Sequence, residues 1–281
     1  MIEILDGAMG TELMRLGLPL DGPGWSARAL EHAPELVRSL HESYAQAGAT
    51  LHTANTFRTQ PGSPLGERWV ELARRAVQIA REVASSHGQR VAGSIAPLED
   101  CYRPDLSPPD AEARHRILAE VLADAGCDLL LCETFPHPGE ALVALEAAVA
   151  TALPAWLSLS AGYRADLLTP EEVARTAKRA ADAGASALLI NCVPADRTLP
   201  YLVALRDAGL PFGAYANAGP LEGVMGWQAE PDAAAQAYLA HVRTWVEEGA
   251  TIFGGCCGTG PSHIAAVARF ANSRYARRPE R

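Results

Sequence analysis

The chain of 281 residues has few of the features that mark secreted, membrane-bound or nucleic-acid-binding proteins. Its N-terminus has no basic stretch followed by an apolar segment, and nowhere do about 18 apolar residues follow one another. Lysine and arginine number 24 against 33 aspartates and glutamates, so the net charge is −9 and no basic stripe is present. We therefore expect a cytoplasmic protein whose partners are neither nucleic acid nor an anionic membrane surface.

Three other signals are missing, and each absence narrows the architecture or the chemistry. The first predicted strand is followed by "DGAMGTEL" (6–13), which has only two glycines, so the Gly-x-Gly-x-x-Gly loop of dinucleotide-binding folds is absent. The eight histidines include no His-x-His pair and none beside a cysteine, which disfavours a histidine-based metallohydrolase. No low-complexity linker divides the chain, so we expect one domain over residues 1–273 and a frayed tail over 274–281.

What the chain does contain is a repeated pattern of helix, glycine, short apolar run, and polar or thiol residue. The clearest copies are "AQAGATLHTANT" (45–56), "ADAGCDLLLCET" (123–134), "ADAGASALLINC" (181–192) and "VEEGATIFGGCC" (246–257). In each copy the glycine (Gly48, Gly126, Gly184 or Gly249) lies where the C-terminus of a helix favours a left-handed residue. The apolar run after it predicts a strand buried on both faces.

Weaker strands are predicted at 2–5, 90–95, 155–160 and 211–216, with amphipathic helices between the strands. The helices are expected at 34–47, 67–86, 109–124, 138–150, 170–183, 199–208, 232–247 and 261–271, and a proline opens several of them. Eight strands, each followed by a helix, predict a single (β/α)8 barrel of the TIM type. An open doubly wound sheet is the alternative, and it would need fewer strands or a reversed edge strand.

Polar and thiol side chains follow the predicted strands at their carboxyl ends, where the active sites of such barrels lie. In chain order they are Asp6, Asn55 with Thr56, Ser94, Glu133, Ser160, Asn191 with Cys192, Asn217, and Cys256 with Cys257. The sixth strand supplies Cys192 and the eighth supplies the adjacent pair, and alternate strands contribute to the same interior layer of a barrel. We therefore expect the three thiols to converge although they are distant in sequence.

Three converging thiolates are typical of a catalytic zinc site, in which the fourth position of a tetrahedral Zn2+ stays open. A thiolate-rich ion is a good host for another sulfur, so the expected chemistry is activation of a substrate thiol as nucleophile. A disulfide between the adjacent cysteines, or two buried apolar thiols, are the alternatives. Cys101, Cys127 and Cys132 lack such partners in the pattern and are expected to be core or loop thiols.

The carboxylates at the strand ends indicate how a substrate is held. Glu133 follows a buried strand, and a buried carboxylate needs a cationic partner, either a substrate ammonium or a structural arginine or lysine. Asp6 is placed similarly, although Asp before Gly also simply forms a turn. Backbone amides of 6–13 and the hydroxyl of Thr56 are candidates for a substrate carboxylate. A thiol, an ammonium and a carboxylate together describe a thiol amino acid. The candidate substrate-binding residues are Asp6, Gly7, Asn55, Thr56, Glu133 and Asn217.

At these residues the chain resembles the homocysteine S-methyltransferase family of zinc-dependent (β/α)8 enzymes. The resemblance is carried by "DGAMGTEL" (6–13), "ANTF" (54–57), "GSIAP" (93–97), "CETF" (132–135), "INC" (190–192), "NAG" (217–219) and "GGCCGTGPSHI" (254–264), which occur in family order. It implies that the zinc ligands are Cys192, Cys256 and Cys257, and that Glu133 and Asp6 seat homocysteine. It also implies that the homocysteine thiolate attacks the methyl group of an onium donor to give methionine, a step of methionine biosynthesis.

Differences from the family pattern gather on the side of the methyl donor. Gly260 stands where family members commonly carry Thr, Ala216 stands where Pro is common, and the loop 96–110 is shorter than in S-methylmethionine-dependent enzymes. Arg58 follows "NTF" where betaine-dependent members present an aromatic residue, and a cation there would repel a quaternary ammonium. We therefore expect two small-molecule substrates, homocysteine and a sulfonium donor such as S-methylmethionine.

Two alternatives to this function stay open. One is a methyltransferase that acts on another thiol or on a selenol, because a barrel does not fix the reaction. The other is a zinc- or thiol-binding module of a methyl-transfer complex that has no turnover of its own.

Overall fold

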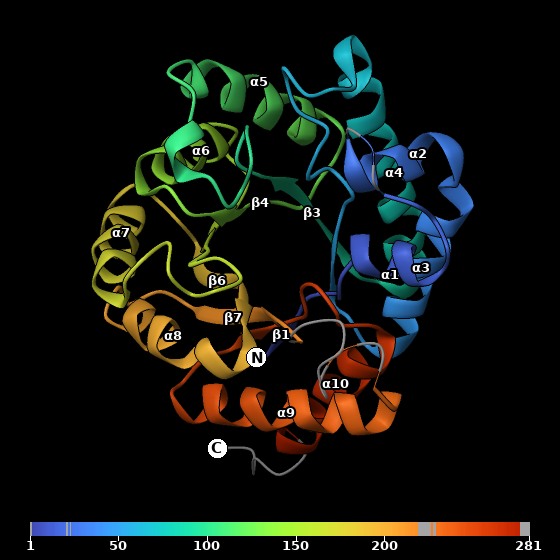
Figure 1. The fold of residues 1–281 in the computed structure, drawn as a ribbon, viewed down its shortest axis with the longest axis vertical. Coiled ribbons are helices and arrows are strands. Elements are labelled where there is room, and N and C mark those ends of the chain that lie inside the picture. Colours follow the sequence, from blue (N-terminus) through green and yellow to red (C-terminus); the bar gives the residue numbers. More distant parts are fainter. Residues whose placement is uncertain (1, 21, 23, 219–225, 227–228, 276–281) are drawn as a thin grey trace.

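Every strand that the computed structural model describes runs parallel to its neighbours in one sheet; the described residues are 2–20, 22, 24–218, 226 and 229–275. The strands are β1 (Glu3–Ile4), β2 (Leu51–Thr53), β3 (Arg90–Ile95), β4 (Leu129–Phe135), β5 (Ala155–Leu159), β6 (Ala187–Pro194), β7 (Phe212–Asn217) and β8 (Ile252–Phe253). Their order is β1-β8-β7-β6-β5-β4-β3-β2, and a bridge between Leu5 and Leu51 joins the two ends of the sheet. Helices surround this ring of strands (Figure 1). The predicted (β/α)8 barrel is therefore confirmed.

Each predicted helix is present, with ends that differ by a few residues from the prediction. The barrel helices are α3 (Pro34–Ala47), α4 (Trp69–His87), α5 (Ala111–Asp124), α6 (Pro138–Val149), α7 (Pro170–Asp182), α8 (Leu199–Arg206), α9 (Pro231–Glu247) and α10 (Pro261–Tyr275). The predicted end of the last helix, at 271, is too early, and the residues 276–281 of the predicted tail lie outside the described residues. In the part of the chain that is described, no helix is both long and apolar enough to cross a bilayer.

Short elements that the sequence did not predict lie in the loops. They are α1 (Gly10–Arg15), α2 (Ala29–His32), and the 3-10 turns η1 (Trp25–Arg28), η2 (Gly66–Arg68), η3 (Pro104–Leu106) and η4 (Ala195–Arg197). The glycines of the repeated pattern do end helices in the left-handed conformation: Gly48, Gly126, Gly184 and Gly249 have φ angles of 98°, 94°, 96° and 95°. The repeated pattern predicted the strands correctly because each copy contains both the glycine that ends a helix and the apolar run that forms the next strand.

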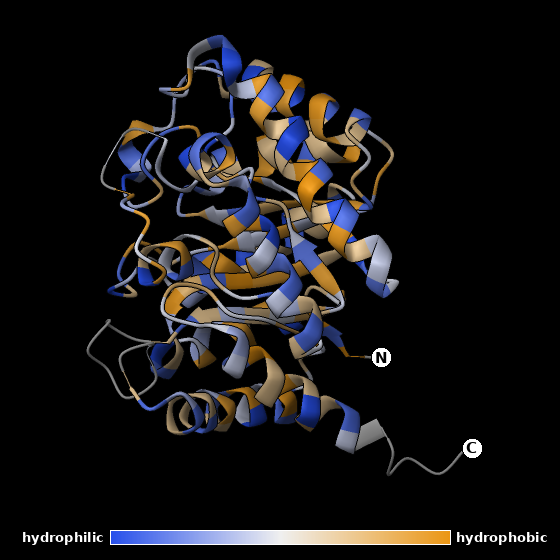
Figure 2. Cartoon of the chain, turned by 90° about the vertical axis from the view of Figure 1, so that its right-hand side faces the viewer, coloured by the Kyte–Doolittle hydropathy of each residue, from blue (hydrophilic) through white to orange (hydrophobic). Residues whose placement is uncertain are grey.

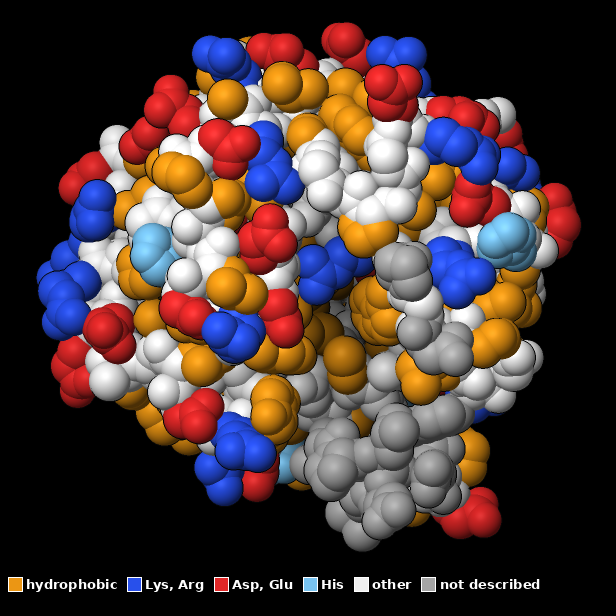
Figure 3. Space-filling model, turned by 45° about the horizontal axis from the view of Figure 1, so that its top comes forward, with side chains coloured by type: hydrophobic (Ala, Val, Ile, Leu, Met, Phe, Trp, Pro, Cys, Tyr) orange, Lys and Arg blue, Asp and Glu red, His pale blue; other side chains and the backbone are white. Residues whose placement is uncertain are grey.

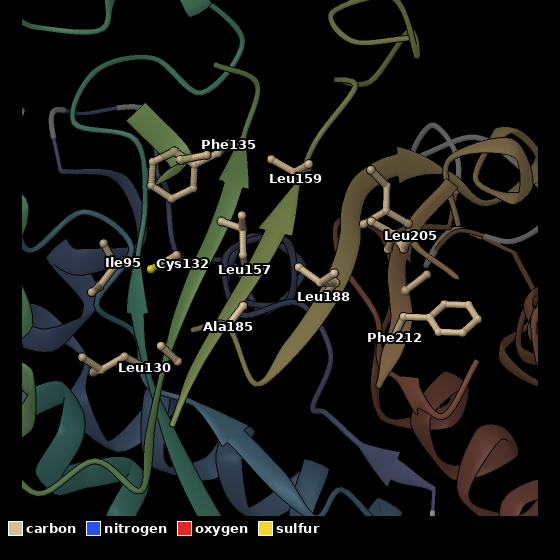
Figure 4. Packing of buried hydrophobic residues seen from close by; sticks show 14 of the residues in the cluster. Ile95, Leu130, Cys132, Phe135, Leu157, Leu159, Ala185, Leu188, Leu205 and Phe212 are labelled. Carbon is tan, nitrogen blue, oxygen red and sulfur yellow. The ribbon is translucent and has the colours of Figure 1, made fainter. Parts of the chain in front are cut away.

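Two apolar layers stabilise the barrel. The inner layer takes residues from every strand or its immediate end, namely Leu5, Leu51, Ala92, Leu129, Leu131, Trp156, Ala187, Leu189, Tyr215 and Ile252. The outer layer lies between the strands and the helices. Strand residues adjacent to those of the inner layer belong to it and pack with helix residues, and Figure 4 shows Ile95, Leu130 and Leu157 in this cluster. Cys127 and Cys132 are part of this larger cluster, so the prediction that they are core thiols is confirmed. The helices carry hydrophilic residues interspersed with hydrophobic ones (Figure 2).

The backbone of β8 lies close to Gly213 on β7. A Cβ atom at this position would lie 1.8 Å from the carbonyl oxygen of Ile252, a distance that no side-chain rearrangement relieves because the neighbour is backbone. Gly213 therefore permits the strand pairing that brings the end of β8 to the barrel mouth.

We expect Gly213→Ala to lower the free energy of unfolding by about 3 kcal/mol, since the two strands must move apart. Urea denaturation of the purified proteins would measure the loss. Gly88→Asn is the control, because Gly88 ends α4 at φ 66°, a Cβ atom there would have no neighbour within 4 Å, and Asn tolerates that conformation. A similar loss in both variants would contradict the explanation.

Candidate metal and substrate site

Three thiols from two strand ends meet at one point of the barrel mouth. Cys192 lies on β6, and Cys256 and Cys257 follow β8. The Sγ atoms of Cys192 and Cys256 are 2.6 Å apart, and the three Sγ atoms all lie within 4.8 Å of one another. None of the three is in a disulfide. The predicted convergence of the three thiols is therefore present in the structure.

The backbone of β6 is distorted where it presents the first thiol. Pairing with β7 shifts register between Asn191 and Pro194, and Cys192 within that interval has a φ angle of 53°. A left-handed conformation is costly for a residue with a side chain, and the surrounding contacts must stabilise it. The Asn191 amide does so, because its Oδ1 accepts hydrogen bonds from the Thr134 N–H at 3.0 Å and the Ser158 hydroxyl at 2.7 Å. The irregularity in the strand thus directs Cys192 toward the pair after β8.

The segment that carries the adjacent cysteines is fixed by glycines and by a buried tyrosine. A Cβ atom on Gly255 would lie 2.2 Å from the hydroxyl oxygen of Thr259, whose hydroxyl donates to the Cys256 carbonyl at 2.7 Å. The hydroxyl of Tyr238 donates to the Gly254 carbonyl at 2.8 Å. These contacts are close enough that the backbone around the two thiols has little freedom to move.

The three thiols titrate as one group. Hydrogen bonds with Cys256 and Cys257, with burial added, raise the pKa of Cys192 well above the ordinary value. The hydrogen bond with Cys192 lowers the pKa of Cys256, but the hydrogen bond with Cys257 and burial outweigh it, so the pKa of Cys256 is also raised above that value. The hydrogen bonds from Cys192 and Cys256 hold the pKa of Cys257 well below it. A single negative charge is therefore the favoured state of the isolated cluster, and three thiolates together require a cation. The donor set of three sulfurs suits a soft divalent ion such as Zn2+.

A cavity of about 500 Å³ opens beside the thiols, and Figure 3 shows the hollow on this face of the molecule. Its wall is mostly apolar with a few polar groups, as in small-molecule sites. Of the predicted site residues, those that line it are Asp6, Gly7, Asn55, Glu133, Cys192, Cys256 and Cys257. Most of the residues predicted from strand ends thus share one cavity.

Glu133 is buried and has no arginine or lysine ion-pair partner among the described residues. Its Oε1 accepts a hydrogen bond from the Ser94 hydroxyl, and its Oε2 accepts one from the Tyr215 hydroxyl at 2.9 Å. Burial raises the pKa of Glu133 above its ordinary value of 4.5, and the two hydrogen bonds oppose that shift. The carboxyl group is therefore held in a fixed orientation beside the cavity without a cation of the protein's own.

Asp6 and Gly7 form the start of the loop after β1. The Asp6 Oδ2 accepts the Thr53 N–H at 3.0 Å, and burial raises the pKa of Asp6 to about 8. At Gly7 a Cβ atom would lie 2.7 Å from the ring of Tyr44, so the loop passes close to α3 at this point.

Three other predicted residues are engaged by the protein or lie apart from the cavity. Asn55 lines the cavity, but its amide is hydrogen-bonded to Ser26 at distances of 2.8 and 2.9 Å. Thr56 does not line it, because its hydroxyl donates to the Ser94 carbonyl at 2.8 Å and so joins β2 to β3. Asn217 is buried at the end of β7 and is also outside the cavity wall, and Gly219 of "NAG" lies outside the described residues. The structure therefore does not bring Thr56 and Asn217 to the cavity.

Several cavity residues come from loops that sequence reasoning did not assign. Trp25 and Phe57 line the cavity with ring centroids 6.1 Å apart, and Arg58 lies over the Phe57 ring at 5.0 Å. Cys101, predicted as a core or loop thiol, is a loop thiol that lines the cavity together with Tyr102. Electrostatic repulsion by Cys192 in its ionised form, and then burial, raise the pKa of Tyr102. For Trp25, Cys101 and Tyr102 the rule that loops after strands surround the mouth was the available sequence signal, whereas Phe57 and Arg58 were marked by the motif "ANTF" and the residue after it.

The loop that carries Cys101 and Tyr102 is tied to α6. The Oε1 of Glu140 accepts the Leu98 N–H at 2.9 Å and lies 3.1 Å from Nε2 of His115. Burial raises the pKa of Glu140, but the hydrogen bonds from His115 and Leu98 outweigh it, so the net shift is below the ordinary value. Glu140 thus fixes one wall of the cavity from a distance.

Comparisons with known proteins agree with the fold and indicate the family of the chain. A protein-family model described as "Homocysteine S-methyltransferase" matches residues 3–271. Homocysteine S-methyltransferase YbgG of Bacillus subtilis is 32% identical over 96% of this chain and 94% of its own length, and Homocysteine S-methyltransferase of Escherichia coli is 33% identical over 95% and 94%.

Similar solved structures include the homocysteine methyltransferase MmuM from Escherichia coli. Its oxidized form has a TM-score of 0.81 with 31% identity over 96% of each chain, and its metallated form has a TM-score of 0.79 with 30% identity over 96% of each. A selenocysteine methyltransferase of Astragalus bisulcatus is 28% identical over 96% of this chain and 92% of its own length.

We expect Glu140→Gln to lower the free energy of unfolding by about 1–2 kcal/mol at pH 7, because the charged hydrogen bonds to Leu98 and His115 are lost. The pKa of Glu140 lies below its ordinary 4.5, so its charge stabilises the fold above that pH and the effect is lost as pH falls. Urea denaturation at pH 7 and near pH 4 should therefore show the difference between variant and parent shrinking with acid. Glu146→Gln, an exposed change on the same helix, serves as control and should leave stability unchanged at both values.

Proposed function

This chain belongs to the homocysteine S-methyltransferase family, and on that basis we propose that it transfers a methyl group from a small onium donor to the thiolate of L-homocysteine, giving methionine. The observation that carries the proposal is the meeting of Cys192, Cys256 and Cys257 at one side of a cavity that also contains the buried Glu133 carboxyl. That arrangement has a place for a metal, for a thiol beside it and for an ammonium group.

The three cysteines are the residues that would hold Zn2+. The fit rests on the donor set, because three sulfurs within 4.8 Å of one another leave one position of a tetrahedral ion for a further ligand. A zinc ion bound there supplies the charge that keeps an added thiol deprotonated at neutral pH. The protein's own part is to keep the ligands fixed through the Cys192 bulge and the glycine frame around Cys256. Free thiols in all six cysteines favour a reducing compartment, so we place the enzyme in the cytoplasm.

Glu133 is the proposed seat for the ammonium group of homocysteine. Its carboxyl is oriented by Ser94 and Tyr215 and has no cationic partner within the described residues, so an incoming ammonium would relieve the cost of burying it. Asp6 is the second candidate, since it lines the same cavity and is oriented by the Thr53 amide. Gly7 and Asn55 would form the cavity wall next to Asp6.

The donor side of the cavity favours a sulfonium amino acid over betaine. Arg58 has no ion-pair partner in the described ranges, and its guanidinium would attract a carboxylate and repel an onium centre. In betaine the two charges are one carbon apart, so both would lie near Arg58. S-methylmethionine also has an ammonium one carbon from its carboxylate, but its reacting sulfonium is separated from the carboxylate by three carbons. The carboxylate can therefore approach Arg58 while the reacting centre approaches the thiols.

The function test is a donor screen with homocysteine, with methionine detected by mass spectrometry. Methionine from S-methylmethionine, and little or none from betaine, is the expected result. Selenocysteine belongs in the screen as a second acceptor, because one relative is named a selenocysteine methyltransferase. Bound metal with no methylated product from any acceptor would instead favour the non-catalytic module.

We expect Cys256→Ala to lose both the thiolate-bound metal and methyl transfer, since two thiolates do not complete the ligand set. In the Co2+-substituted parent, sulfur-to-metal charge-transfer absorption reports this site directly, and the variant should lack it. Cys127→Ala, which changes a thiol of the core cluster, should keep the absorption. A Cys256 variant with unchanged absorption would refute the ligand assignment.

Glu133→Gln should raise the KM for homocysteine by about 10-fold or more and leave the KM for the donor nearly unchanged, because only the ammonium loses a charged partner. Steady-state kinetics with each substrate varied in turn would separate the two constants. An unchanged KM for homocysteine would remove Glu133 from the ammonium seat without affecting the metal assignment.

A further inference from the structure

A second cluster of metal-ligand side chains lies at the closure of the barrel, and it shares no residue with the cysteines. Asp6 follows β1, His41 lies on α3 and His52 lies on β2. One ligand atom from each of the three lies within 4.8 Å of the others, and all three side chains are buried, with exposed fractions of 4%, 0% and 0%. Leu51 points into the barrel centre, so the next residue, His52, points outward toward the helices.

The contacts inside this cluster are too long for hydrogen bonds. The Asp6 Oδ2 is 3.7 Å from Nδ1 of His41 and 4.0 Å from Nδ1 of His52. Neither ring nitrogen of His41 has a hydrogen-bond partner in the described part of the chain, and neither does Nδ1 of His52. Buried polar nitrogens are nearly always paired, so the unpaired Nδ1 atoms of His41 and His52 beside Asp6 call for a missing partner.

The tautomer of His52 shows which kind of partner is missing. Nε2 of His52 lies 2.6 Å from Oε1 of Gln89, and an amide oxygen only accepts hydrogen bonds, so Nε2 carries the proton. The lone pair is then on Nδ1, the atom that faces Asp6. A histidine whose far nitrogen donates to a carbonyl while its near nitrogen presents a lone pair is the usual arrangement of a metal ligand.

We propose that Asp6, His41 and His52 form a second metal site, which takes a divalent transition-metal ion of the zinc class. Bonds of about 2.0–2.2 Å from zinc to nitrogen or oxygen separate neighbouring donor atoms by roughly 3–4 Å, which matches the measured distances of 3.7 and 4.0 Å. Two imidazoles and one carboxylate suit zinc, iron, cobalt or nickel better than calcium or magnesium.

The charge state of the cluster agrees with this assignment. Burial lowers the pKa of His41 to about 3 and raises that of Asp6 to about 8, so burial disfavours the charged form of both groups. A bound cation would take the place of the Asp6 carboxyl proton and give Nδ1 of His41 and Nδ1 of His52 a partner.

The second ion has a structural consequence at the point where the ring of strands closes. It would join the end of β1 to β2 and to α3, where the sheet is closed by the bridge between Leu5 and Leu51 and by the backbone hydrogen bonds beside it.

Metal stoichiometry tests the proposal without any reference to activity. The full chain is freed of metal with a chelator under reducing conditions, loaded with Zn2+, freed of excess by gel filtration, and analysed by inductively coupled plasma mass spectrometry. Two zinc ions per chain are expected in the parent protein, and His52→Leu should reduce the number to one. A folded parent that retains a single ion overturns the proposal, and an ordered water would then be the partner of these nitrogens.

A matched control and a spectroscopic measurement keep the test independent of folding defects. His115→Leu changes another buried histidine beside a carboxylate, on α5, and should leave two ions bound. A Cys256→Ala, Cys257→Ala variant loaded with Co2+ should retain one ion whose spectrum has no sulfur-to-metal absorption. Loss of all metal from that variant, with its far-ultraviolet circular dichroism unchanged, contradicts a second site even where His52→Leu fails to fold.

Discussion

Closure of the parallel sheet is the constraint on which the other features depend. β1 and β8 are only two residues long, and the ring is completed by one bridge between Leu5 and Leu51. Because closure forces all carboxyl ends to one rim, residues far apart in the chain become neighbours there. Polar contacts reinforce the same point: the Asp6 N–H donates to the Leu51 carbonyl at 3.0 Å, and the Gly255 N–H donates to the Asp6 carbonyl at 3.1 Å. The seam of the barrel and the two ligand clusters are therefore parts of one structure.

The barrel and its thiols could be predicted from the sequence because both depend on local patterns. Gly48 and the equivalent glycines mark helix ends, and the apolar runs after them are strands, so counting strands gave the architecture. Once the architecture is known, Cys192 and Cys256 are expected to lie close together, because they end strands six and eight and alternate strands contribute to the same layer of the barrel. This reasoning needs no knowledge of loop conformation, and the structure agrees with it.

Residues whose role depends on which way a side chain turns could not be predicted in this way. Thr56 stands at a strand end like the others, yet its hydroxyl bonds the Ser94 carbonyl. Cys101 and Tyr102 reach the cavity because Glu140 on α6 holds the Leu98 amide, a contact between segments 42 residues apart. His41 and His52 meet because the side chain of His52 points outward from β2, toward the side of α3 that faces the barrel. The pattern of apolar residues does not record such coincidences between elements.

The walls of the cavity have two different origins. The three clustered cysteines and Glu133 stand on or directly after strands whose positions the barrel fixes, whereas Trp25, Phe57, Arg58 and Tyr102 lie in turns or loops outside the sheet. Sequence change in those segments alters one wall and leaves the sheet pairing intact. Proteins with this barrel can therefore evolve to use a different methyl donor through changes in these loops, while the residues that bind the acceptor sulfur stay the same.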